Sequence, residues 1–61
     1  MDKEKLIRFK NCIGRELGMR KNVYPKWVKA GRMKQETADM EIETMSEIYE
    51  YFKWRIDLSN G

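Results

Sequence analysis

The chain has 61 residues, of which 38% are charged and 41% are hydrophobic, with a formal net charge of +3. This composition is too polar for a membrane span and too apolar for a simple disordered tail. The length predicts one small domain, residues 1–61, and the single cysteine, Cys12, excludes a disulfide within the chain. The absence of histidine excludes catalytic sites built on a histidine base. Because no metal-binding side chains cluster either, we expect no enzyme activity, no metal and no cofactor.

The net charge conceals an asymmetry between two parts of the chain. Residues 1–34 contain eleven basic and three acidic side chains, whereas residues 35–61 contain two basic and seven acidic ones. One interpretation is that two oppositely charged helices pack together, so that the charges set their orientation. The other is a basic surface that binds a polyanion.

The basic part predicts a helical arm over residues 3–30. Asp2 is a candidate N-cap. Gly14 and Gly18 indicate either a close approach of another helix or a locally weak helix. Apolar residues follow Asp2 at spacings of 3, 4 and 4, which is one face of a helix: Leu6, Phe9, Ile13 and Leu17.

Pro25 interrupts this arm. Its ring removes a hydrogen-bond donor and clashes with the preceding turn, so the helix either kinks there or breaks. In the second case Asn22 caps a new short helix with Pro25 in its first turn. Gly31 suits the left-handed end of the arm, and residues 31–34 form the predicted turn. Lys34 is a weak cap for the helix that follows.

The acidic part contains the clearest pattern and predicts one amphipathic helix over residues 35–56. Apolar residues recur at spacings of 4, 3, 4, 3 and 4, a seam of nearly three heptads made by Ala38, Ile42, Met45, Tyr49, Phe52 and Ile56. Ile48 widens this seam beside Tyr49. We expect residues 57–61 to be a frayed tail.

These elements predict an all-α antiparallel helical hairpin, kinked or broken near Pro25. The acidic seam forms its core with apolar residues of the basic arm: Leu6, Phe9, Ile13, Leu17 and Trp27. Because the core of so small a hairpin is thin, we expect a homodimer that resembles a four-helix bundle.

Residues 19–34 combine cations with aromatic rings and contain no acidic side chain. Cations contact phosphates and aromatic rings stack on exposed bases, so this segment is a candidate nucleic-acid-binding surface. Core packing of Tyr24 and Trp27 is the alternative. The candidate residues are Arg20, Lys21, Tyr24, Lys26, Trp27, Lys29, Arg32 and Lys34.

A second candidate surface lies in the acidic helix. Tyr51 and Trp54 fall outside the seam, and Leu58 shares one helical edge with them. Surplus aromatic side chains on an outer face are typical of protein interfaces. The alternative is that they widen the apolar stripe within an oligomer.

The central part of the chain, residues 15–52, resembles a group of short phage and prophage proteins. The resemblance depends on a Val-Tyr-Pro-x-Trp-Val string, a glycine and an Ala-Asp-x-Glu-Ile string, with the matched residues Met19, Arg20, Val23, Tyr24, Pro25, Trp27, Val28, Gly31, Met33, Ala38, Asp39, Glu41, Ile42 and Met45. It implies a phage-like origin and a helical hairpin, and it implies no activity.

Together these observations predict a small protein-interaction module, an adaptor or inhibitor of a host or phage protein. A nucleic-acid-binding accessory protein that uses residues 19–34 is the alternative. No secretory signal or membrane span is apparent, so we expect a cytoplasmic protein without a membrane partner.

Overall fold

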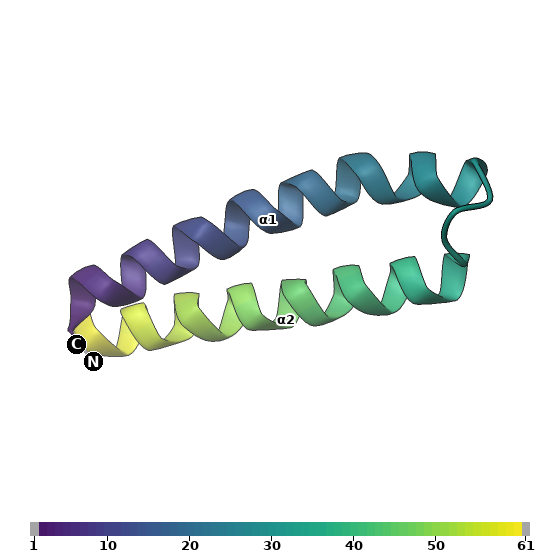
Figure 1. Ribbon diagram of the computed structural model, residues 1–61. Helices are drawn as coiled ribbons and strands as arrows, with labels where there is room; N and C mark the ends of the chain where they lie inside the picture. The colour runs from purple at the N-terminus through teal and green to yellow at the C-terminus, as the bar shows by residue number, and fades with distance from the viewer. Residues whose placement is uncertain (1, 61) are drawn as a thin grey trace.

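The computed structural model describes residues 2–60, which form two long α-helices joined by a short turn. α1 spans Lys3–Lys29 and α2 spans Gln35–Asn60. The helices lie side by side and antiparallel, with the start of α1 and the end of α2 together and the turn at the opposite end (Figure 1). Since residues 2–60 contain no strand, the predicted all-α helical hairpin is confirmed.

Both ends of α1 are capped as the sequence predicts. The Asp2 side chain accepts a hydrogen bond of 2.8 Å from the backbone N–H of Lys5, which satisfies one donor of the first turn. At the other end Gly31 has a φ of +76°, the left-handed conformation that glycine adopts without strain. The backbone N–H of Arg32 donates to the carbonyl of Trp27 at 2.8 Å, and that of Gly31 to the carbonyl of Val28 at 3.0 Å. This pair of bonds is a Schellman motif, which ends α1 and starts the turn.

Pro25 lies inside α1 and does not divide it. The helix continues from Lys3 to Lys29, so the predicted alternative in which Asn22 caps a second helix is wrong. A proline in a helix interior removes one backbone hydrogen bond. The remaining backbone bonds and the packing against α2 keep α1 continuous.

α2 extends beyond the predicted end at residue 56, so the expectation of a frayed tail is wrong for residues 57–60. No proline or glycine interrupts this stretch. Ser59, which often favours a turn, donates its hydroxyl to the carbonyl of Arg55 at 3.1 Å, one helical turn earlier. The hydroxyl is thus satisfied inside the helix. Gly61 lies outside the described residues.

The core is a single seam between the helices. Leu6 and Ala38 are its fully buried members, with exposed fractions of 1% and 2%. Phe9 and Phe52 meet edge to face with ring centroids 5.9 Å apart. The rest of the predicted acidic seam is half-buried, as expected for one helix against one helix: Ile42, Met45, Tyr49, Phe52 and Ile56.

The two glycines of α1 occupy different environments. A Cβ on Gly14 would lie 2.9 Å from Cε1 of Tyr49, closer than real Cβ contacts allow, whereas a Cβ on Gly18 would meet nothing within 4 Å. Close helix approach therefore explains Gly14. Gly18 fits the alternative of a locally weak helix.

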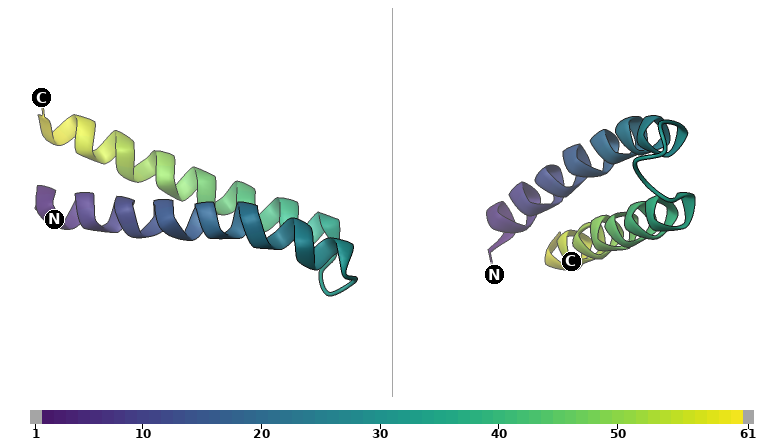
Figure 2. Two further views of the ribbon diagram at one scale, coloured as in Figure 1. Left: turned by 90° about the horizontal axis from the view of Figure 1, so that it is seen from above. Right: turned by 45° about the vertical axis from the view of Figure 1, so that its right-hand side comes forward.

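The hairpin is long and thin, with extents of 46 × 15 × 13 Å. Its two helices are inclined to each other by a small angle, which is visible when the molecule is seen from above (Figure 2). Because a pair of helices has no enclosed interior, most side chains stay partly exposed to solvent.

Candidate functional site

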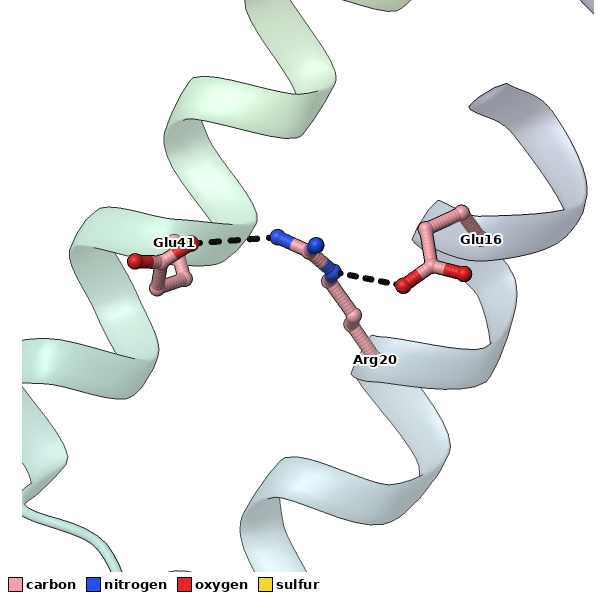
Figure 3. A network of polar contacts seen from close by, with 3 residues as sticks. All are labelled: Glu16, Arg20 and Glu41. Carbon is pink, nitrogen blue, oxygen red and sulfur yellow. Dashed lines mark hydrogen bonds and ion pairs between the residues drawn. The ribbon is translucent and has the colours of Figure 1, made fainter. Parts of the chain in front are cut away.

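Arg20, a predicted nucleic-acid ligand, is engaged between the helices. Its Nε donates to Glu16 at 3.0 Å within α1, and Nη1 of the same guanidinium group donates across to Glu41 of α2 at 3.1 Å (Figure 3). The hydrogen bond to Glu16 is the main reason that the pKa of Arg20 is raised above its ordinary value. With two carboxylates already bound, this cation contributes little attraction to a phosphate.

Tyr24 and Trp27 continue from Arg20 along the same helix. The Arg20 guanidinium lies 5.8 Å from the centre of the Tyr24 ring. The Tyr24 and Trp27 rings stack at 5.6 Å with an angle of 30°. Tyr24 is half-buried, but Trp27 is 42% exposed. The prediction that Trp27 belongs to the core is therefore wrong for the single hairpin, because α2 begins only at Gln35, after the turn, and does not extend alongside Trp27.

The other predicted nucleic-acid ligands are exposed and lie near the turn: Lys21, Lys26, Lys29, Arg32 and Lys34. The structure does not gather them into one strip. With 100° between successive helical residues, Lys21 lies on one flank of α1, while Lys26 and Lys29 lie on its outer side. They surround the turn end of the hairpin as a diffuse positive region.

A pocket opens beside Trp27 that the sequence did not predict. It encloses about 210 Å³ and is lined by Glu16, Met19, Arg20, Val23, Tyr24 and Trp27. All six residues belong to α1, and Met19 is 56% exposed at its edge. The available signal was the spacing of Met19, Val23 and Trp27 at intervals of four, a second stripe beside the Leu6 face.

The predicted protein-interface residues lie on the side of α2 that faces away from α1. Tyr51, Trp54 and Leu58 are 50%, 55% and 58% exposed, and we call them the outer patch. The ring centroids of Tyr51 and Trp54 are 6.0 Å apart, and Arg55 lies 3.5 Å from the Tyr51 hydroxyl. Tyr51 and Trp54 therefore form a solvated pair of rings, and Leu58 is exposed on the same side of α2.

The remaining reactive groups do not form a site. Within residues 2–60, no three histidine, cysteine, aspartate or glutamate side chains lie where they could hold a metal ion. Cys12 is an exposed free thiol on α1. Neither helix of this part of the chain is both long and apolar enough to cross a membrane.

Comparison with protein-family models, with curated protein sequences and with solved structures finds no match to this chain. The resemblance to phage and prophage proteins therefore stays a prediction. What the chain does has to be inferred from its own surfaces.

Proposed function

We propose that this chain is a small non-enzymatic protein-interaction module, an adaptor or inhibitor that binds a protein of a phage or of its host. The observation that supports the proposal is the outer patch. Three large side chains, each at least half exposed, lie within an eight-residue stretch of α2, and only Tyr51 among them has a ring contact with a seam residue, Phe52, at 5.6 Å within the described residues. Side chains of this kind are typical of interface residues that dominate binding energy.

The spacing and surroundings of the outer patch define the chemistry of the partner. Tyr51, Trp54 and Leu58 follow the i, i+3, i+7 pattern by which one helix inserts into an apolar groove. Acidic residues precede the patch on the same helix: Glu43, Glu47 and Glu50. The fitting partner is therefore a protein with an apolar groove and a basic rim.

Replacing both rings, Tyr51→Ser with Trp54→Ser, tests this surface. Each ring would contribute about 2 kcal/mol at an interface, so the affinity for the partner falls at least about 30-fold per ring. The measurement is a pull-down from source-cell lysate read by mass spectrometry, followed by titration of the captured protein. Far-UV circular dichroism monitors helicity, which stays unchanged because the rings are outside the seam.

Met40→Ser is the matched control, because Met40 is 59% exposed on the same outer side of α2 but eleven residues from Tyr51. A protein retained by the wild type and by Met40→Ser, but lost by the double variant, supports the proposal. Equal capture by all three chains contradicts it. A loss of helicity in the double variant would show that the rings belong to the core.

The module acts as a homodimer in this proposal. Leu6 and Ala38 are the buried side chains of the described core, and the accessible surface is 4810 Å². A compact monomer of 7.4 kDa exposes about 4,200 Å². The excess of about 600 Å² supports self-association as the means of stabilising the fold.

A nucleic-acid-binding accessory protein is the second candidate. The exposed cations around the turn favour it, together with the half-exposed Trp27 ring on which a base could stack. Two features weaken it: Arg20 is held by two carboxylates, and Glu36 and Asp39 follow directly after the turn. We therefore rank it below the protein-interaction module.

Salt dependence tests the second candidate. If a labelled single-stranded oligonucleotide binds the turn end, neutralising Lys26, Lys29 and Arg32 together lowers the slope of log affinity against log salt by about 2. The control neutralises three exposed cations elsewhere on α1: Lys5, Arg8 and Arg15. No binding at low salt, or equal slopes for the two triple variants, contradicts nucleic-acid recognition by this segment.

A further inference from the structure

The two long sides of the hairpin differ in polarity. Phe9 contacts Phe52 and Arg20 contacts Glu41, so these four residues mark one side on which α1 and α2 meet. Helical spacing places further apolar residues beside them. We call this side the pocket face; its apolar members are Phe9, Cys12, Met19, Val23, Trp27, Ile48 and Phe52.

The opposite side is marked by Tyr49, which lies against Gly14 and under the Lys53 ammonium at 5.7 Å. Its remaining flank includes the polar residues Lys10, Lys21, Ser46 and Glu50, and one exposed apolar residue, Ile7 of α1. Among residues 2–59, it is the pocket face that combines exposed large apolar side chains of both helices, Met19 and Trp27 from α1 and Ile48 from α2. It also contains the open pocket beside Trp27.

We propose that a second copy of this chain covers the pocket face, with both turns at the same end of the dimer and each α1 packed against α2 of the other copy. The proposal rests on the homodimer of the proposed function and specifies its interface and orientation. The resulting bundle has its two-fold axis parallel to the helices.

Area supports a second copy as the occupant. The hairpin is 46 Å long and 15 Å wide, so one side covers about 700 Å². A stable interface buries about 800 Å² per partner. A second hairpin matches this face along its full length, because the two copies have the same dimensions.

Charge determines the orientation. α1 contains nine basic and two acidic residues, and α2 contains two basic and seven acidic residues. When two hairpins stack face to face, α1 lies either on α1 or on α2 of the other copy. Helix axes in contact are about 8–10 Å apart, which is comparable to the screening length of about 8 Å at physiological salt. The arrangement of α1 on α2 therefore pairs opposite charges throughout, whereas α1 on α1 opposes two basic helices.

The Glu16–Arg20–Glu41 cluster gives this arrangement a register. It lies in the middle of the pocket face and joins the two helices (Figure 3). A two-fold axis parallel to the helices keeps each residue at the same height as its copy, so the two clusters form one polar layer. A polar layer in an apolar helical interface disfavours shifted pairings.

The face is tested with two pairs of substitutions at exposed positions. Met19→Ser with Ile48→Ser changes the pocket face, and Met40→Ser with Leu58→Ser changes the outer side of α2. Sedimentation equilibrium measures the dimer dissociation constant, with helicity monitored in the same samples. We expect the first pair to raise the constant at least about 100-fold, because four apolar side chains per dimer lose their burial. The second pair changes it by less than about threefold.

The relative orientation of the two copies is tested in a variant whose pocket face differs from the wild type only at Cys12. A spin label is attached to the chain carrying Arg32→Cys and Cys12→Ser, both at exposed positions, and the distance between the labels is measured by pulsed electron resonance. With the turns together we expect about 30 Å or less, from helix spacings and label lengths. A distance near the 46 Å length of the hairpin overturns the orientation.

The outcomes separate this inference from the function on which it rests. A dimer weakened by the outer pair, and not by the pocket-face pair, overturns the inference and leaves the homodimer standing. A monomer at every concentration overturns both the inference and the homodimer. Partner capture by the outer patch is measured independently and is affected by neither result.

Discussion

At the scale of single residues, the two glycines of α1 show what sequence spacing can and cannot predict. Gly14 and Gly18 lie four residues apart and are indistinguishable as a pattern. Only the position of Tyr49 on the facing helix separates them, because its ring occupies the space that a Gly14 side chain needs. The relevant information is therefore the register between the helices, which neither helix contains alone.

Alanine at the two glycines gives opposite results. Gly18→Ala raises the free energy of unfolding by about 1 kcal/mol, since alanine favours the helix and no atom lies within 4 Å of the new Cβ. Gly14→Ala gains the same propensity but forces Tyr49 to move, an overpacking cost of about 1–3 kcal/mol. We expect it to leave stability unchanged or lower it by up to about 2 kcal/mol. Urea unfolding of both variants measures the difference, and an equal gain at both positions would contradict the close contact.

At the scale of elements, the helices follow from periodicity and their ends from capping chemistry. The Asp2 cap and the left-handed Gly31 are where the sequence predicts them, because both depend on local backbone chemistry. The end of α2 was predicted too early, since the Asp-Leu-Ser-Asn composition favours turns in general while Ser59 satisfies its hydroxyl within the helix. Trp27 was assigned to the core because spacing indicates a face and not how far the facing helix extends.

Pro25 is the element-scale feature with the clearest energetic consequence. Its ring leaves the carbonyl one turn earlier without its usual donor, and a proline in a helix interior costs about 3 kcal/mol relative to alanine. We expect Pro25→Ala to raise the free energy of unfolding by about 1–3 kcal/mol in urea titrations. Lys26→Ala, at the exposed neighbouring position, is the control and changes it by less than about 0.5 kcal/mol. A decrease for Pro25→Ala would mean that the ring shapes α1 to follow α2.

At the scale of the whole molecule, the candidate surfaces are better defined than their occupants. The sequence predicted the outer patch, because Tyr51, Trp54 and Leu58 fall outside the seam and share one helical edge, and all three are exposed. It did not predict the pocket face, because that face is made of flank residues of both helices and depends on how the two helices pack against each other. The sequence also predicted that the basic segment forms one surface. The helix instead distributes these cations around its circumference near the turn.

The proposed homodimer makes thermal stability depend on protein concentration. A dimer of two such chains has an unfolding entropy of about 0.26 kcal/mol/K, estimated from the average entropy per residue. Each tenfold rise in concentration adds about 1.4 kcal/mol to the stability of the dimer. The Tm therefore rises by about 5 °C per tenfold increase in concentration, measured by circular dichroism. A Tm independent of concentration, with cooperative unfolding, would show that the hairpin is stable as a monomer.

The start of α1 and the end of α2 lie together, with the turn about 46 Å away. A tensile load applied across these neighbouring ends pulls perpendicular to the seam, so the helices peel apart one turn at a time, beginning beside Leu6. A load between one end of the chain and the turn instead acts along the axis of a single helix, so it stretches the backbone hydrogen bonds of that helix and does not shear the seam contacts. The seam contacts are therefore loaded, one turn after another, only when the two neighbouring ends of the chain are pulled apart.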